Sequence, residues 1–295
     1  MYTIKEAAAR TGLSIPVLRA WERRYGVVAP TRTPGGYRVY DEAAIGRLRA
    51  MRRLIDAGWS ASTAAAAVVA GDAGPASLVT DTQSAAAFDP ALTERLVDAA
   101  AALDSPGVER VLDDMFATGS FERVMDAQVV PGLRALGDAW ASGRVTVAGE
   151  HLASNAVQRR LAAAFQASAV GDDAQPPILV GMPAGARHEL GGLMFATAAR
   201  RAGLPVAYLG ADLPLAEWLA AVARTHAPAA VIGALLERDA DSALEIGREL
   251  RKQNPELVIA YGGRAAPDPD GTPRTIRLPT EVRDAVAALR SALRA

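Results

Sequence analysis

The chain contains no cysteine among its 295 residues, and aromatic side chains make up only 5% of it. Without cysteine, disulfide frameworks, cysteine-ligated zinc, iron–sulfur clusters and thiol nucleophiles are excluded, and a metal has only histidine or carboxylate side chains as ligands. The sequence also lacks the run of about 18 apolar residues that a membrane-spanning helix needs, and its first residues contain no apolar signal-peptide core. We therefore expect a cytoplasmic protein with no membrane partner.

Motifs of several common enzyme classes are missing as well. The sequence has no Gly-x-x-x-x-Gly-Lys or Gly-x-Gly-x-x-Gly segment for nucleotides, no Gly-x-Ser-x-Gly segment and no His-Glu-x-x-His segment. His188-Glu189 begins like the last of these, but Gly192 stands where the second zinc ligand would be needed. We therefore expect that the protein is not an enzyme.

Charge is distributed unevenly along a chain whose formal net charge is only −1. Residues 1–70 contain eleven basic and five acidic residues, so this segment carries +6, whereas the remainder carries −7. A small basic segment joined to an acidic remainder is typical of a nucleic-acid module attached to a sensor. A solvated basic surface is the alternative interpretation of the charge alone.

Two short helices are predicted at the start of the chain. Thr3 and Glu6 have the spacing of a capping box, which predicts a helix over residues 4–10 that a glycine ends. Ser14 is the expected N-cap of a second helix over residues 15–24. Two short helices joined by a tight turn form a helix-turn-helix, whose second helix can enter the major groove of DNA.

A basic wing is expected after these helices. Residues 31–40 have strand-like side chains on both sides of Pro34-Gly35-Gly36, which predicts a turn between two short strands. The arginines and hydroxyl groups of this segment are of the kinds that hold phosphates and fix the register on a duplex. Asp41 then caps a predicted helix that reaches Asp56, and a last helix is expected over residues 62–69.

This order of elements resembles the MerR family of winged-helix transcriptional regulators over residues 1–72. The segments that carry the resemblance are Thr3–Ala8, Leu18–Gly26 and Gly35–Tyr40. The resemblance implies a homo-oligomer, with at least two copies of the chain on double-stranded promoter DNA. The residues expected to contact DNA are Arg19, Arg23, Arg24, Tyr25, Arg32, Arg38 and Tyr40, whereas solvated surface charges are expected at Arg47, Arg49, Arg52 and Arg53.

The remainder of the chain is predicted to contain a linker and two further domains. Residues 73–90 are poor in charge and rich in small side chains, as linkers are. Residues 91–172 have helical periodicity with three breaks, which predicts a four-helix bundle. Residues 173–295 alternate short apolar runs with helices, which predicts a doubly wound, Rossmann-like parallel sheet. The four strands are expected at residues 178–182, 206–210, 229–233 and 257–262.

Two of the three histidines can be interpreted from this pattern. His226 ends a predicted helix, where an imidazole complements the helix dipole, so we expect a structural role. His188 follows the first predicted strand, at the sheet edge where parallel folds bind ligands. From Gly191, 41 residues intervene before Gly233-Ala234-Leu235, and another 26 before Gly262-Gly263.

This spacing resembles the pattern of cobalamin-binding domains, Asp-x-His-x-x-Gly followed by Ser-x-Leu and Gly-Gly. The resemblance implies that His188 ligates cobalt from below and that the nucleotide tail of the cofactor enters the sheet. A neutral imidazole is a good nitrogen ligand for cobalt, and glycines let the backbone approach a ligand closely. Ala186 and Gly233 depart from the acidic and serine positions of the pattern. The implied cofactor contacts are His188, Gly191, Gly233, Leu235, Gly262 and Gly263.

Trp140 precedes Glu150-His151 with nine residues between them, within the predicted bundle. Upstream of a cobalamin-type sheet, this motif resembles that of the CarH/LitR-type photoreceptors, MerR-family repressors that use adenosylcobalamin as a light-sensitive ligand. The resemblance implies that Trp140, Glu150 and His151 contact the adenosyl group or the corrin, and that light breaks up a dimer or tetramer and releases DNA. Ala141 stands where family members have a second histidine for cobalt.

Two other functions agree with parts of the sequence. A MerR-type regulator with a degenerate cobalamin domain would act without cobalamin or with another tetrapyrrole such as a bilin, and Ala141, Ala186 and Gly233 favour it. A corrinoid methyltransferase or mutase module would share the bundle and the sheet. The basic helix-turn-helix and the absence of length for a substrate barrel argue against such a module.

Overall fold

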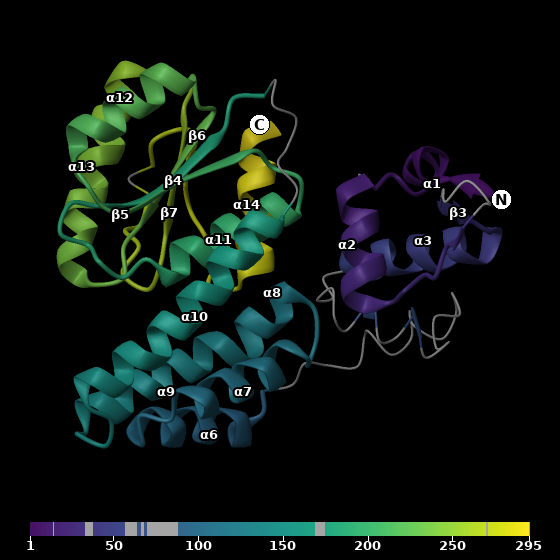
Figure 1. Cartoon of the computed structure of the whole chain (residues 1–295). Coiled ribbons are helices and arrows are strands. Elements are labelled where there is room, and N and C mark those ends of the chain that lie inside the picture. The colour runs from purple at the N-terminus through teal and green to yellow at the C-terminus, as the bar shows by residue number, and fades with distance from the viewer. Residues whose placement is uncertain are drawn as a thin grey trace. The chain divides into compact units, whose positions relative to one another are not determined.

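The computed structural model of the chain describes residues 1–13, 15–32, 38–56, 64–65, 68–69, 88–168, 175–269 and 271–294 (Figure 1). The chain divides into two compact units. One consists of Met1–Leu92 and Asp113–Gln128, and the other of Thr93–Leu112 and Val129–Ala295. Within the described ranges, no helix combines the length and apolar character required to cross a bilayer.

The N-terminal part of the first unit contains a helix-turn-helix and a small sheet. Helices α1 (Ile4–Thr11), α2 (Ile15–Tyr25) and α3 (Glu42–Asp56) confirm the three helices predicted over residues 4–56. Strands β1 (Tyr2–Thr3), β2 (Thr31–Arg32) and β3 (Arg38–Tyr40) form an antiparallel sheet in the order β1-β3-β2. Strand β1 was not predicted, because two residues carry no periodicity.

Local hydrogen bonds explain where the first helix begins and ends. The Glu6 amide donates to Thr3 Oγ1 over 3.4 Å and the Thr3 amide donates to Glu6 Oε2 over 2.7 Å, which confirms the capping box. Gly12 ends α1 in the left-handed conformation, with φ +64°. The expectation that Arg49 and Arg52 are merely solvated is wrong, since they donate to the Arg10 and Thr11 carbonyls at the end of α1.

Some predicted features of this unit lie outside the described residues. They are the Ser14 cap, the Pro34-Gly35-Gly36 turn and all of the linker up to residue 87. Of the helix predicted over residues 62–69, residues 64–65 and 68–69 are described, and they are helical. The predicted boundaries at residues 72 and 172 also fall outside the described ranges, so the domain boundaries stay predictions.

Apolar faces of the three helices meet in one core. Leu18 and Trp21 of α2 are buried together with Tyr40 at the end of β3. The other large members of this core are Val27, Val28, Ile45, Leu48, Met51 and Leu54. The core therefore fixes α2 to the wing strand β3, the arrangement that a winged helix needs.

Residues 90–167 are helical, as predicted, in four stretches. These are α6 (Pro90–Ala101), α7 (Ser105–Phe116), a run made of α8 (Phe121–Val124), η1 (Met125–Val129) and α9 (Val130–Ala141), and α10 (Val147–Ala167). The third stretch contains one π-helical turn, η1. Pro131 is the second residue after this turn, and because it has no N–H it cannot continue the regular hydrogen-bond pattern.

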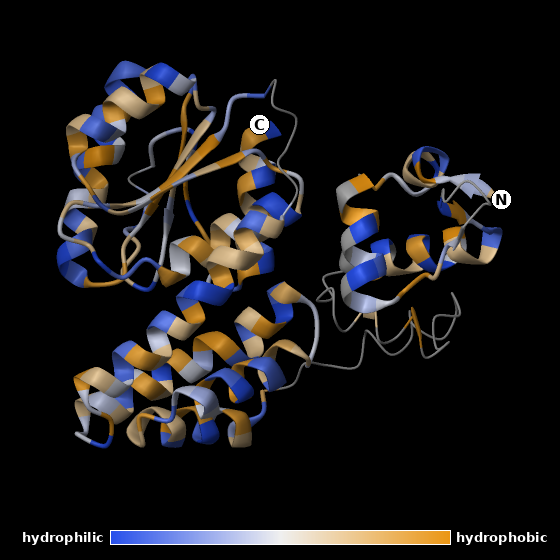
Figure 2. Ribbon diagram, viewed as in Figure 1, coloured by the Kyte–Doolittle hydropathy of each residue, from blue (hydrophilic) through white to orange (hydrophobic). Residues whose placement is uncertain are grey.

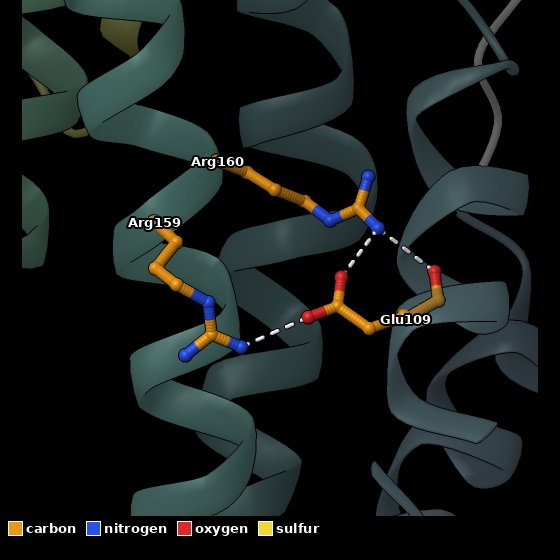
Figure 3. Close-up of polar contacts among 3 residues, drawn as sticks. All are labelled: Glu109, Arg159 and Arg160. Carbon is orange, nitrogen blue, oxygen red and sulfur yellow. Dashed lines mark hydrogen bonds and ion pairs between the residues drawn. The ribbon is translucent and has the colours of Figure 1, made fainter. Parts of the chain in front are cut away.

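Ion pairs tie these helices together within the second unit. Glu109 of α7 accepts hydrogen bonds from Arg159 over 2.9 Å and from Arg160 over 2.7 Å, both on α10 (Figure 3). Arg144, in the turn before α10, donates to Glu94 and Asp98 of α6 over 2.5 and 2.7 Å. Helix α10 is thus linked to both α6 and α7, which fixes the position of its polar side chains.

The C-terminal part is a five-stranded parallel sheet with helices on both faces (Figure 1). Its strands are β4 (Ile178–Pro183), β5 (Val206–Leu213), β6 (Ala229–Gly233), β7 (Val258–Gly262) and β8 (Thr275–Arg277), in the order β5-β4-β6-β7-β8. The predicted fold class and the four predicted strands are confirmed. Strand β8 was not predicted, because it has only three residues and they are incompletely buried.

Helices α11 (Leu190–Arg201) and α14 (Val282–Arg294) cover one face of this sheet, and α12 (Leu215–Thr225) and α13 (Glu237–Gln253) cover the other. The central strands are apolar, whereas the covering helices also carry hydrophilic residues (Figure 2). Burial on both faces explains the continuous apolar runs in the sequence. The loops after β4 and β6 enter helices on opposite faces, so a crevice is expected at the carboxyl ends of these adjacent strands.

The Glu109 ion pairs generate a prediction about stability. Hydrogen bonds from Arg159, followed by those from Arg160, hold the pKa of Glu109 below its ordinary value of 4.5. Its contribution is therefore complete above pH 4.5 and is lost as the pH falls through the lower folded-state pKa. Because these groups are partly exposed, we expect Glu109→Gln to destabilise the chain by about 1 kcal/mol or less at pH 7.

Thermal unfolding followed by circular dichroism at pH 7 and pH 3 tests this. The matched control is Glu249→Gln, which removes an exposed pair with Lys252 on a single helix and should leave the midpoint almost unchanged. Equal midpoints for Glu109→Gln and wild type at pH 7 would show that the pairs do not hold α7 to α10.

Candidate functional site

The side chains expected to contact DNA lie mainly on the second helix of the helix-turn-helix. Arg19 and Arg23 of α2 are exposed, and Tyr25 at the end of the same helix is partly exposed. Arg24 lies in α2 and Arg32 in β2, and their side chains lie outside the described part of the structure. The exposed arginines on α2 give this helix the basic surface that a recognition helix needs.

The wing strand is anchored to α2 by a carboxylate. Arg38 donates through Nε to both oxygens of Glu22, over 3.0 and 3.1 Å, and the Tyr40 hydroxyl donates to Glu22 over 3.4 Å. Tyr40 is fully buried, so a structural role replaces the expected contact of its hydroxyl with phosphate. Burial and the neighbouring Glu22 raise the pKa of Tyr40, which keeps the hydroxyl a donor.

The loop that bears His188 leaves the sheet at its topological switch point. It follows β4 and leads into α11, and neighbouring β6 ends at Gly233. The start of the loop is fixed to the end of β5. The Gly185 amide donates to Asp212 Oδ1 over 2.6 Å, and the Asp212 amide donates to the Ala186 carbonyl over 3.1 Å.

His188 itself is exposed, and its imidazole makes no hydrogen bond to any residue in the described ranges. Ala186, at the position where the cobalamin pattern has an acid, is 3% exposed. The adjacent Glu189 bonds elsewhere, to Gln158 over 2.6 Å and to Tyr208 over 2.9 Å. An unengaged, accessible imidazole at the switch point is available as a nitrogen ligand.

The glycines near this loop differ in whether the backbone or the packing requires glycine at their positions. At Gly191 an added Cβ would meet nothing within 4 Å, and at Gly262 only Leu278 at 3.5 Å, so neither residue is required by packing. At Gly233 a Cβ would lie 2.9 Å from the sulfur of Met182. Gly263 has φ +106°, and a Cβ there would overlap the Ala234 carbonyl, so the backbone alone requires glycine. Space for a Cβ therefore remains open at Gly191, in the first turn of α11 after the His188 loop.

Leu235 is 37% exposed in the loop after β6. Its side chain is therefore accessible for an apolar contact, although a single exposed leucine is common on protein surfaces. His226 caps α12 in the left-handed conformation with φ +52°, which confirms its expected place at a helix end.

The residues of the Trp-x9-Glu-His motif lie at the end of α9 and the start of α10. Trp140 is 51% exposed, an unusual exposure for so large an apolar side chain. His151 Nδ1 is 2.6 Å from Glu150 Oε2, and Ser154 donates to the other oxygen of Glu150. Trp140 is therefore not a core aromatic, whereas Glu150 and His151 form a contact pair near the start of α10.

Comparisons with known proteins agree with these observations. The model of the MerR HTH family regulatory proteins matches residues 2–68, and that of the B12 binding domain matches residues 92–164. The HTH-type transcriptional repressor CarH of Myxococcus xanthus is 33% identical over 276 residues, which are 90% of this chain and 89% of that protein.

The chain belongs to the CarH family of MerR-type transcriptional regulators with a B12-binding domain. The repressor CarA of the same organism is 36% identical over 215 residues, 72% of this chain and 69% of that protein. The monomethylamine corrinoid protein of Methanosarcina barkeri has the same fold over 68% of this chain and 99% of its own, with a TM-score of 0.54 and 15% identity.

The comparisons support three statements about this member of the CarH family. The relatives are transcriptional regulators rather than enzymes. The MerR helix-turn-helix implies DNA binding, and the B12-binding domain indicates cobalamin as the ligand. The matched range 92–164 contains Trp140, Glu150 and His151, so this motif belongs to the B12-binding domain.

The two kinds of glycine generate a prediction. Gly263→Ala should lower the free energy of unfolding by at least about 2 kcal/mol, because of its φ and the overlap with Ala234. Gly191→Ala should leave it unchanged or raise it by up to about 1 kcal/mol, because alanine favours the helix and meets no neighbour. Thermal unfolding of the two variants without ligand provides the measurement, and a destabilised Gly191→Ala would contradict the open space at this loop.

Proposed function

We propose that this protein is a light-responsive repressor that binds adenosylcobalamin between the helical segment and the carboxyl edge of the sheet. The observation that carries the proposal is the free imidazole of His188 at the switch point, beside the helix α10, which carries the Glu150-His151 pair near its start. The hydrogen bond from Gln158 of α10 to Glu189 shows that this helix passes next to the His188 loop.

The lower side of the site is formed by the sheet. His188 would hold cobalt, and the nucleotide tail would lie along the glycines that end β6 and β7. Gly191 leaves open space for the approach of the corrin, and exposed Leu235 offers an apolar contact. The residues of this side are His188, Gly191, Gly233, Leu235, Gly262 and Gly263.

The upper side of the site is formed by the helical segment. Adenosylcobalamin supplies a cobalt–carbon bond that visible light cleaves. Trp140 would pack on the adenosyl group and shield it from water, while the Glu150-His151 pair would accept and donate hydrogen bonds to its polar edge. A second histidine ligand for cobalt would have to come from His151 or another donor, because Ala141 has no ligand to offer.

Release of the adenosyl group would then change the oligomer. Trp140 would lose its packing partner and α9 and α10 would change position. A dimer or tetramer that presents several helix-turn-helix domains would then dissociate. Affinity for promoter DNA is lower when fewer linked domains bind at the same time. Arg19, Arg23, Arg24, Tyr25, Arg32 and Arg38 would contact the duplex in the bound state.

A second candidate is a CarH-type regulator that no longer depends on cobalamin, or that binds another tetrapyrrole such as a bilin. Two observations favour it. No carboxylate in the described ranges bonds to His188, and such partners strengthen metal-binding histidines about 10- to 100-fold. The sulfur of Met182 also lies beside Gly233, where the nucleotide tail would pass.

The two candidates predict different responses to light. The chain purified with adenosylcobalamin in darkness should take up the cofactor, elute as an oligomer in gel filtration, and dissociate after green light with a change in its absorption spectrum. His188→Ala should bind the cofactor at least about tenfold more weakly. His226→Ala is the matched control, since it removes a histidine that caps a distant helix.

Unchanged spectra and elution volumes in wild type under both conditions would remove the light-sensing function. The same experiment with biliverdin in place of adenosylcobalamin tests the second candidate directly.

The DNA-binding surface generates a separate prediction. Arg23→Ala should weaken operator binding and lower the slope of log K against log salt by about 1, because one phosphate contact is lost. Arg47→Ala, an exposed arginine of α3, is the control and should keep the wild-type slope. Fluorescence anisotropy at several salt concentrations gives both slopes, and identical slopes for Arg23→Ala and wild type would contradict the contact.

A further inference from the structure

Glu189, the residue directly after His188, joins three elements of the second unit. Its Oε1 accepts from Gln158 Nε2 of α10 over 2.6 Å, and its Oε2 accepts from the Tyr208 hydroxyl of β5 over 2.9 Å. The same hydroxyl lies 3.2 Å from the Glu189 carbonyl. All three side chains are partly buried, so these charge-assisted bonds are shielded from competing water.

Gln158 belongs to a polar line along α10 that starts at the Trp-x9-Glu-His motif. Glu150, Ser154 and Gln158 are spaced four residues apart and therefore share one face of the helix. The Ser154 hydroxyl donates to the Glu150 carboxylate, whose other oxygen contacts His151. One end of this line is the expected upper side of the ligand site, and the other end is bonded to the neighbour of His188.

Aromatic contacts hold α10 in place beyond this line. Phe165 of α10 meets Tyr208 edge-on, with ring centroids 6.0 Å apart, and the Arg200 guanidinium of α11 stacks on Phe165 at 3.9 Å. Arg200 also donates to the Phe165 carbonyl over 3.3 Å. Burial, and then the bond to Glu189, raises the pKa of Tyr208, so its hydroxyl remains a donor at any physiological pH.

The two sides of His188 are held in different ways. Before His188, Asp212 ties Gly185 and Ala186 to the end of β5, so this part of the loop depends on the sheet alone. After His188, Glu189 depends on both β5 and α10. A shift of α10 therefore changes only the second attachment, and the imidazole lies between a fixed point and a movable one.

From this geometry we propose that Glu189 is a positioning residue that links α10 to the His188 loop, so that the position of the helix and the orientation of the imidazole depend on each other. The link is a property of the chain without any ligand. Only its consequence for cobalt ligation rests on the function proposed above. It gives the helical segment a direct physical route to the lower side of the site.

Hydrogen–deuterium exchange of the cofactor-free protein tests the link. Gln158→Met removes the donor on α10 while keeping the length of the side chain, and we expect peptides covering residues 184–192 to exchange about fivefold faster. Tyr208→Phe removes the other donor and should act in the same direction. The control is Gln166→Met, an exposed position further along the same helix, which should leave exchange at this loop unchanged.

A second measurement addresses His188. The protein labelled with 15N-histidine is loaded with cob(II)alamin, and the nitrogen splitting in its electron paramagnetic resonance spectrum reports a histidine on cobalt. We expect this splitting in wild type and Gln166→Met, and a reduced histidine-bound fraction with at least about fivefold weaker binding in Gln158→Met.

The outcomes separate the link from the proposed function. Wild-type exchange in both Gln158→Met and Tyr208→Phe would overturn the link whatever the cofactor does. Faster exchange in both variants, together with no cobalamin binding by wild type, would support the link and reject the light-sensing function. Faster exchange with unaltered histidine ligation would overturn the claim that the imidazole depends on α10.

Discussion

The reversal of strand order at β4 is the constraint on which the ligand-binding half of the molecule depends. The chain passes from β4 to β5 on one side and then crosses to β6 on the other. The loops that end β4 and β6 consequently enter helices on opposite faces, which is the arrangement at which open parallel sheets bind ligands. His188 and Leu235 lie in these two loops because of this topology, although 46 residues separate them in the sequence.

Features encoded within a few residues could be predicted from the sequence. The capping box at Thr3, the helical spacing of the apolar residues in α3 and the apolar runs of β4 to β7 each depend on local interactions. Strands β1 and β8, with two and three residues, depend on pairing with neighbours and have no signal of their own. The π-turn before Pro131 is an intermediate case, since a proline inside a helical pattern indicates a disturbance but not its form.

The sequence selects candidate residues for the site but not their contacts. Motif spacing selected His188, Trp140 and Glu150, whereas Gln158 and Tyr208 belong to no motif and meet Glu189 only through tertiary packing. The burial of Tyr40 was missed because its residue type suggested a contact with phosphate, although its position in β3 relates it to Arg38. Alternation along β3 puts Tyr40 on the same side as Arg38, and both bond to Glu22 of α2.

The bond between Arg38 and Glu22 has a consequence for recognition. The carboxylate occupies Nε only, and the two terminal nitrogens of the guanidinium have no bond to the described residues. The side chain is thereby held in one arrangement, so less rotamer entropy would be lost if it bound a phosphate, as proposed above. A lysine at this position would lack the rigid fork by which arginine holds Glu22 through Nε while its two terminal nitrogens stay available for a second partner.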